Sequence, residues 1–204
     1  DLLREIIMDR DLETGDEPDF LRSLISEISL VKGQLLSMDY YHSQSCADSV
    51  FQLIYKQYNE KLRKNQWMDF DDILVYTYSL LKEREDLLAA WQNKFQYILI
   101  DEFQDTDPQQ YRIFRRIWRR QADTALLLIG DPKQAIYAFR GADIFTYMKA
   151  RSEVSAHYTL DTNWRSAPGM VNSVNTIFSQ MNDAFMFRDI PFSPVKSAEK
   201  NQSL

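Results

Sequence analysis

The stretch that decides the fold reads YILIDEFQDTDPQQ, from Tyr97 to Gln110. Four apolar residues run without interruption into two adjacent carboxylates, Asp101 and Glu102. A short continuous apolar run is typical of a strand in a parallel sheet that is buried on both faces. Ligands bind beyond the carboxyl ends of such strands. The sequence therefore predicts a ligand site at this acidic pair.

Further strands and helices are predicted on either side of this stretch. The apolar run ALLLIG (125–130) predicts a second strand, and a third is expected at 157–160. Pro108 stands at a first-turn position of a helix predicted between the first two strands. This alternation of strands and helices predicts an α/β fold for the second half of the chain.

The residues before Gln96 are predicted to be helical, because apolar side chains recur there at helical spacing. In MDFDDIL (68–74), three aspartates, Asp69, Asp71 and Asp72, stand where the N-terminus of a helix favours negative charge. The final segment, DIPFSPVKSAEKNQSL (189–204), is punctuated by Pro and Ser and is predicted to be loose.

Composition excludes several classes of protein. A hydrophobic content of 45% indicates a folded domain, and no apolar run reaches membrane-spanning length. The single cysteine, Cys46, excludes an internal disulfide framework and suits a reducing cytosol, so a cytoplasmic location is expected. The two histidines, His42 and His157, lie too far apart in sequence for a zinc site. With a net charge of -6, any nucleic-acid binding is expected in a local groove.

The acidic pair has the chemistry of phosphoryl transfer. Magnesium prefers oxygen ligands, which suits Asp101. Glu102 is suited to orient or deprotonate an attacking water. The alternative is a solvated loop start, and the FQD that follows at once favours the functional interpretation.

A second group of candidate residues follows the second predicted strand, in GDPKQAIYAFRGAD (130–143). Gln134 offers an amide that can donate to a phosphate oxygen and accept from a water. Tyr137 and Phe139 offer aromatic faces for unpaired bases, and Arg140 offers a cation for the phosphate backbone. The alternative for the aromatic residues is burial in the core, which is the commoner fate of such side chains.

A third group lies in LDTNWRSAPG (160–169). Trp164 can stack on a purine base, and Arg165 can reach a terminal phosphate. Ser166 and Pro168 predict a helix start that would hold the pair in a fixed loop. The alternative is a buried tryptophan beside a surface arginine.

These three groups, in this order, resemble the motifs of the superfamily 1 DNA helicases of the UvrD/Rep type. DEFQD is similar to motif II of that family, GDPKQAIYAFRGAD to motif III and NWRS to motif IV, and MDFDDIL is similar to a segment that precedes motif II. The second half of the chain looks most like the RecB-type beta subunits of exodeoxyribonuclease V. The resemblance is dense from about Asp69 to Asn175.

The resemblance implies part of a RecA-like motor that uses ATP and Mg²⁺. For the ATP site it implies magnesium coordination by Asp101, a catalytic base in Glu102, γ-phosphate contacts from Gln104, Gln134 and Arg165, and adenine stacking by Trp164. For DNA it implies contacts from Tyr137, Phe139 and Arg140. Family members more often have tryptophan where Phe139 stands and tyrosine where Trp164 stands, and both changes keep an aromatic face.

One part of such a motor is missing from the sequence. A phosphate-binding loop reads G-x-x-x-x-G-K-[ST], and none of the five glycines is followed by lysine. We therefore expect an internal fragment of a helicase, inactive in isolation. Its expected parts are a helical segment of an inserted 1B-like domain (1–66), the latter half of the first RecA-like domain (67–162), and the start of the second motor domain (163–204).

The expected partners follow from the same resemblance. They are single- and double-stranded DNA, with 3′-to-5′ polarity inferred from the family, and other subunits of an exodeoxyribonuclease V-type complex. In the family, the strand YILI would pair with the strand that feeds the phosphate loop. Because the sequence contains no such loop, the strand that feeds it is also expected to be absent. We expect this to expose an edge of the sheet and to favour self-association. The alternative function is a non-catalytic module that binds single-stranded DNA or a partner through the arginines of 112–120.

Overall fold

The computed structural model describes residues 2–9, 17–118, 123–135, 143–181, 183–185 and 187–201. The first half of the chain is helical, with α1 (Leu2–Met8), α2 (Glu17–Gln34), α3 (Asp48–Lys64), α4 (Phe70–Glu83) and α5 (Glu85–Lys94). The middle contains β1 (Tyr97–Ile100), η1 (Phe103–Asp105), α6 (Pro108–Ile117), β2 (Ala125–Leu128), η2 (Pro132–Gln134) and α7 (Ile144–Glu153). The last part contains β3 (Thr162–Asn163), α8 (Pro168–Phe178), β4 (Lys196–Ser197) and η4 (Glu199–Asn201).

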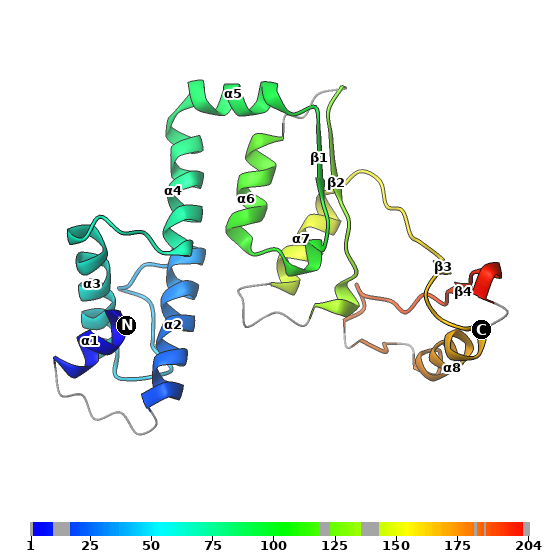
Figure 1. Ribbon diagram of the computed structural model, residues 1–204, viewed down its shortest axis with the longest axis horizontal. Helices are drawn as coiled ribbons and strands as arrows, with labels where there is room; N and C mark the ends of the chain where they lie inside the picture. The colour runs from blue at the N-terminus through cyan, green and yellow to red at the C-terminus, as the bar shows by residue number, and fades with distance from the viewer. Residues whose placement is uncertain are drawn as a thin grey trace.

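Helices α1, α2 and α3 form a lobe of their own, seen in blue and cyan in Figure 1. The apolar positions that recur at helical spacing meet in its core, where Leu24, Phe51 and Ile54 are fully buried. The helical prediction for this part of the chain is confirmed in the described residues.

Helix α4 leads out of this lobe toward the sheet (Figure 1). Its first turn carries a capping box, in which the Asp69 carboxylate accepts from the Asp72 N–H and the Asp72 carboxylate accepts from the Asp69 N–H. These contacts satisfy backbone donors that a helix start leaves free. The prediction of a helix N-terminus at the three aspartates is confirmed.

Strands β1 and β2 pair in parallel, with Ile98 opposite Leu126. Helix α6 connects them, with Pro108 in its first turn and Asp107 as its N-cap. The fold is thus helix-rich with small parallel sheets, which agrees with an α/β architecture.

The prediction that these strands are buried on both faces is wrong for the described structure. Tyr97 and Leu99, on one face of β1, are each 62% exposed. On the opposite face Ile100 and Leu128 pack against Phe103. Successive side chains of a strand point to opposite faces, so an apolar run is covered on both only if a layer lies on each side.

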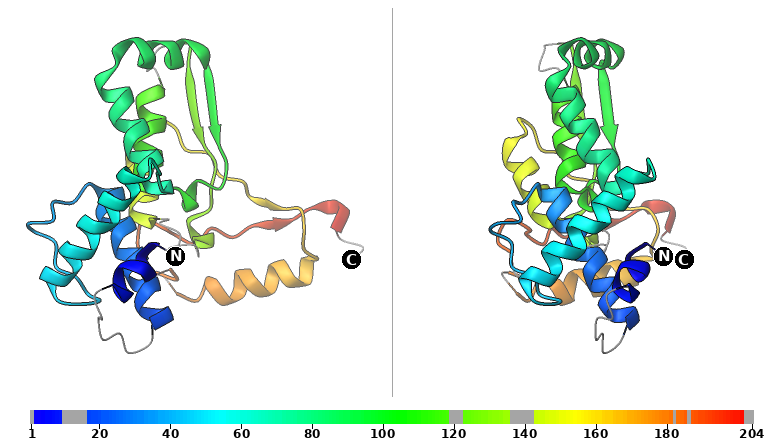
Figure 2. Two further views of the ribbon diagram at one scale, coloured as in Figure 1. Left: turned by 60° about the vertical axis from the view of Figure 1, so that its left-hand side comes forward. Right: turned by 90° about the vertical axis from the view of Figure 1, so that its left-hand side faces the viewer.

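The third strand does not lie at 157–160. Among the residues that the structure describes, no strand pairs with that segment, and Tyr158 and Leu160 are almost fully exposed. Strand β3 comes just after it and pairs in parallel with β4, forming a sheet separate from β1–β2. Figures 1 and 2 show these two small sheets apart. Since β4 lies in the segment predicted to be loose and Ala198 is buried, that prediction is also wrong for the described part.

The core of the helical lobe can be tested with Ile54→Val, which deletes one methyl group from a fully buried position. We expect the free energy of unfolding to fall by about 0.5–1.5 kcal/mol. The measurement is urea denaturation followed by circular dichroism. The matched control is Ile25→Val in α2, where the side chain is 52% exposed and the change should lie within about 0.5 kcal/mol of zero.

Candidate active site at the end of the sheet

The parallel pairing brings the ends of β1 and β2 to one edge of the sheet. The Ile129 N–H donates to the Ile100 carbonyl at 2.8 Å, and the Phe103 N–H donates to the Ile129 carbonyl at 2.8 Å. These two bonds continue the ladder past both strands. The β1–α6 loop (101–107) therefore lies directly beside the residues that follow β2.

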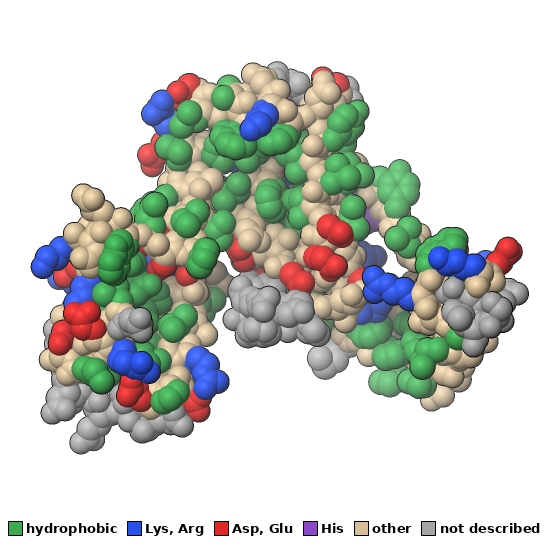
Figure 3. Space-filling view, in the orientation of Figure 1, with side chains coloured by type: hydrophobic (Ala, Val, Ile, Leu, Met, Phe, Trp, Pro, Cys, Tyr) green, Lys and Arg blue, Asp and Glu red, His purple; other side chains and the backbone are tan. Residues whose placement is uncertain are grey.

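Asp101 and Glu102 stand exposed at this edge, where Figure 3 shows acidic side chains gathered. Glu102 has a φ of 51°, a left-handed conformation uncommon for a residue other than glycine. Its N–H donates to the Asp101 carboxylate at 2.9 Å, and its carbonyl accepts from the Asp105 N–H at 2.9 Å. Such backbone strain costs about 1–3 kcal/mol and is concentrated at functional sites.

Gln104 connects the acidic loop to the segment after β2. Its side chain is only 2% exposed; Nε2 donates to the Glu102 carboxylate at 2.6 Å, and Oε1 accepts from the Asp131 N–H at 3.0 Å. One amide thus orients a carboxylate with its donor end and fixes a backbone with its acceptor end. Gln104 and Glu102 of the acidic pair are thus in contact in the structure.

Gln134 reaches the same edge through Asp131. Gln134 Nε2 donates to the Asp131 carboxylate at 3.2 Å, and Lys133 Nζ lies 2.7 Å from the same carboxylate. Burial alone would raise the pKa of Asp131, but hydrogen bonds from Lys133 and Gln134 outweigh it and lower the pKa. Asp131 is therefore an anion whose contacts with Lys133 and Gln134 hold the loop after β2 in place.

Two residues of this edge were not assigned a role from the sequence, Gly130 and Asp131. A Cβ on Gly130 would lie 2.7 Å from Gln104 Oε1, 3.0 Å from Gln104 N and 3.1 Å from Phe103 N. Two of these three atoms are backbone, which cannot swing aside as a side chain can. The available signal was the GDP turn after an apolar run, which marks a tight connection without showing what approaches it.

Trp164 and Arg165 lie away from the sheet edge that carries Asp101 and Glu102. They follow β3, where the Asn163 side chain accepts from the N–H groups of Arg165 and Ser166 at 2.9 and 2.8 Å. Trp164 is 63% exposed, with Lys200 Nζ 5.4 Å from its ring centroid. The third group is thus held in a fixed turn, but β3 lies apart from the end of β1 (Figures 1 and 2).

The predicted DNA contacts, Tyr137, Phe139 and Arg140, lie outside the described residues. The arginine face of α6 can be followed as far as residue 118. Arg115 pairs with Glu153 at 3.0 Å, and Arg116 donates to the carbonyls of Leu81 and Lys82 at 2.9 and 3.3 Å. Two of these arginines therefore serve internal contacts.

Comparison with known proteins shows the family of the chain. Residues 2–155 match the UvrD/REP helicase N-terminal domain. The chain belongs to this family. It is 72% identical over 147 residues to the RecBCD enzyme subunit RecB of Escherichia coli (strain K12), which covers 71% of this chain and 12% of that protein. The chain therefore spans about an eighth of that relative.

Two further relatives extend the comparison. The RecBCD enzyme subunit RecB of Buchnera aphidicola subsp. Acyrthosiphon pisum is 45% identical over 139 residues, covering 68% of this chain and 12% of that protein. The ATP-dependent DNA helicase PcrA of Leuconostoc citreum is 30% identical over 189 residues, covering 89% of this chain and 24% of that protein. The predicted resemblance to UvrD-type helicases of the RecB kind is confirmed.

Two absences hold for the described part of the chain. None of its helices is long and apolar enough to cross a membrane. Within the same residues, no three His, Cys, Asp or Glu side chains form a cluster that could hold a metal ion.

Gly130→Ala tests the close approach of Gln104. We expect the free energy of unfolding to fall by about 1–3 kcal/mol, because the added methyl group meets backbone atoms. Chemical denaturation monitored by circular dichroism measures the loss. Gly33→Ala is the control: a Cβ meets nothing within 4 Å inside α2, and helix propensity predicts a gain of about 0.4–1 kcal/mol. Equal effects of the two variants would contradict the crowding argument.

Proposed function

We propose that this chain contributes the ATP-hydrolysis and single-stranded DNA contact motifs of an ATP-dependent DNA helicase of recombination and repair, translocating 3′ to 5′. The observation that carries the proposal is the Gln104 bridge from Glu102 to Asp131. A buried amide that fixes a carboxylate at the end of a parallel sheet suits a site where a water must be held in line with a phosphate.

The residues at this edge fit a magnesium nucleotide. Asp101 offers exposed carboxylate oxygens, and magnesium is commonly bound by one or two carboxylates together with waters and substrate phosphates, so a three-residue cluster is not required. When bound, magnesium would neutralise charge on the phosphates. Asp101 would hold the ion, and Glu102 would accept the proton of the attacking water.

Gln104 and Gln134 would sense the γ-phosphate. Gln104 accepts from the Asp131 N–H, and Gln134 donates to the Asp131 carboxylate. A movement of one glutamine side chain would therefore be transmitted to the other through Asp131. Trp164 would stack on adenine and Arg165 would reach the γ-phosphate once the segment after β3 closes on the sheet edge. Tyr137, Phe139 and Arg140 would contact single-stranded DNA.

The RecA-like assignment and the three-part division at 66/67 and 162/163 belong to this proposal. Supporting it, the paired strands β1 and β2 lie in the middle part, while β3, which spans the second boundary, pairs with β4 of the last part in a separate sheet. The partners proposed are DNA and further subunits, since two relatives carry the name RecBCD enzyme subunit. The exposed apolar face of β1 supports self-association of the isolated chain. The non-catalytic alternative is less favoured, because Arg115 and Arg116 are engaged internally.

Glu102→Gln tests the catalytic proposal in a RecBCD enzyme whose RecB carries this chain in place of the matching segment. The amide keeps the shape of the side chain but cannot accept the proton, so we expect DNA-stimulated ATP hydrolysis to fall by about 10²-fold or more. Phosphate release measures it. Glu83→Gln, an exposed change at the end of α4, is the control and should keep full turnover. Full turnover of the Glu102 variant would overturn the assignment.

The chain by itself is expected to release no phosphate from ATP above the uncatalysed background, because its sequence contains no G-x-x-x-x-G-K-[ST] loop to hold the phosphates. A coupled phosphate assay with magnesium and single-stranded DNA measures this. Magnesium-dependent turnover that disappears in Glu102→Gln would refute the expectation.

A further inference from the structure

The junction between the helical lobe and the rest of the molecule contains a buried cation. Lys32 of α2 reaches across to the first turn of α4, where its Nζ lies 2.6 Å from Asp69 Oδ2 and 2.9 Å from Asp72 Oδ1. Its side chain is 5% exposed. From α3, Tyr58 donates to Asp69 at 3.1 Å, and its ring centroid lies 5.1 Å from Lys32 Nζ. Lys32 of α2 therefore contacts side chains of both α3 and the start of α4.

A second contact fixes the same two helices one turn away. Ser29 Oγ donates to Asp71 Oδ2 at 2.6 Å. Ser29 and Lys32 stand three residues apart and so share one face of α2. All three aspartates at the start of α4 are thus engaged by α2. Two polar contacts at neighbouring positions specify one register between the helices.

Such a contact is an inefficient way to gain stability. Desolvating a lysine and its partners costs several kcal/mol, and well-packed apolar residues often serve as well or better. Burial by itself would lower the pKa of Lys32, but its hydrogen bonds to Asp69 and Asp72 raise it, so the side chain remains charged. The best-attested use of buried polar pairs is to specify geometry.

The other end of α4 is held by α6. Arg116 donates to the carbonyls of Leu81 and Lys82, which lie in the last turn of α4 where a helix leaves its acceptors free. Helix α6 begins at Pro108, directly after the β1–α6 loop, with Asp107 as its N-cap. Its N-terminus is therefore the end of the loop that carries Asp101 and Glu102. Burial raises the pKa of Asp107, and the nearby charge of Asp71 raises it further.

We propose that Lys32 is a positioning residue, which sets the placement of the β1–α6 loop from the helical lobe by locking α2 onto the start of α4. The path runs from α2 through α4 to α6 and so to the loop. The meaning of this link for ATP hydrolysis rests on the proposed function. The physical link between Lys32 and the loop does not.

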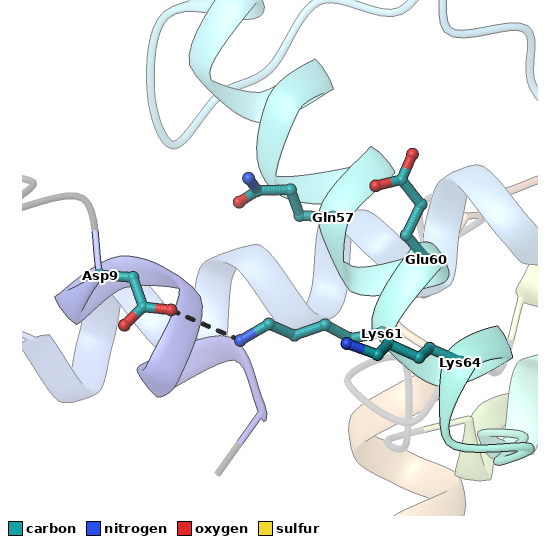
Figure 4. Close-up of a pocket in the computed structure, with 5 residues that line it drawn as sticks. All are labelled: Asp9, Gln57, Glu60, Lys61 and Lys64. Carbon is teal, nitrogen blue, oxygen red and sulfur yellow. Dashed lines mark ion pairs between the residues drawn. The ribbon is translucent and has the colours of Figure 1, made fainter.

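The test uses hydrogen exchange of the loop amides 101–107 in this chain. Lys32→Met removes the cation and should speed their exchange at least tenfold. The matched control is Lys61→Met. Lys61 also lies between two carboxylates, 2.6 Å from Glu5 and 3.6 Å from Asp9, but these contacts are partly exposed and stay inside the helical lobe. Figure 4 shows the ion pair with Asp9. The control should leave loop exchange within twofold of the parent chain.

A second variant separates positioning from stability. Lys32→Met leaves two carboxylates without their cation, so it also destabilises the fold. In Lys32→Met/Asp69→Asn/Asp72→Asn the two carboxylates that paired with Lys32 are neutral amides, and Asp71 keeps its hydrogen bond from Ser29. Asparagine caps a helix as well as aspartate does. We expect its unfolding midpoint to return toward that of the parent while loop exchange stays at least tenfold faster.

Each outcome decides the question. Recovery of loop protection together with stability in the triple variant would reduce Lys32 to a structural role, as would unchanged exchange in Lys32→Met. If Lys32→Met does not fold, the triple variant carries the test by the same criterion. Fast loop exchange combined with full ATP turnover of Glu102→Gln in the RecBCD enzyme would leave the positioning inference standing and remove the proposed function.

Discussion

The parallel pairing of β1 with β2 is the constraint on which the candidate site depends. Because both strands end at the same edge, the loop after one must pack against the loop after the other. Gln104 fits this place because an amide has a donor for Glu102 and an acceptor for the Asp131 N–H. A glutamate of the same shape would lack the donor and place two carboxylates in contact. Gln104 in turn requires glycine at position 130, because its side chain and backbone lie too close to Gly130 to leave room for a Cβ.

Local signals in the sequence were sufficient for features that depend on neighbours along the chain. Pro108 opens α6 and the aspartates at 69–72 cap α4, as predicted, because a first helical turn is satisfied by residues within three positions of it. The end of β1 just before Asp101 was predicted for a similar reason. An apolar run followed at once by polar residues shows where a strand ends.

Features that depend on distant partners were not visible in the sequence. The segment 157–160 has the sequence pattern of a strand, but a strand forms only where another strand can pair with it. In the structure β4 pairs with residues 162–163 instead. The apolar runs of β1 and β2 did not show which face lacks a covering layer. The role of Gly130 depends on a glutamine 26 positions earlier, and that of Lys32 on aspartates about 40 positions later. Trp164 and Arg165 carry no signal of what they face.

The role of a charged surface residue also depends on distant partners that the sequence does not show. The arginines of α6 form a basic face on a helical wheel, which sequence alone cannot distinguish from a nucleic-acid surface. In the fold, Arg115 meets Glu153 and Arg116 completes the last turn of α4, so these two charges hold helices together. Cations that are neutralised by internal partners release few counterions when a polyanion approaches. Arg115 and Arg116 are therefore poorly suited to bind DNA.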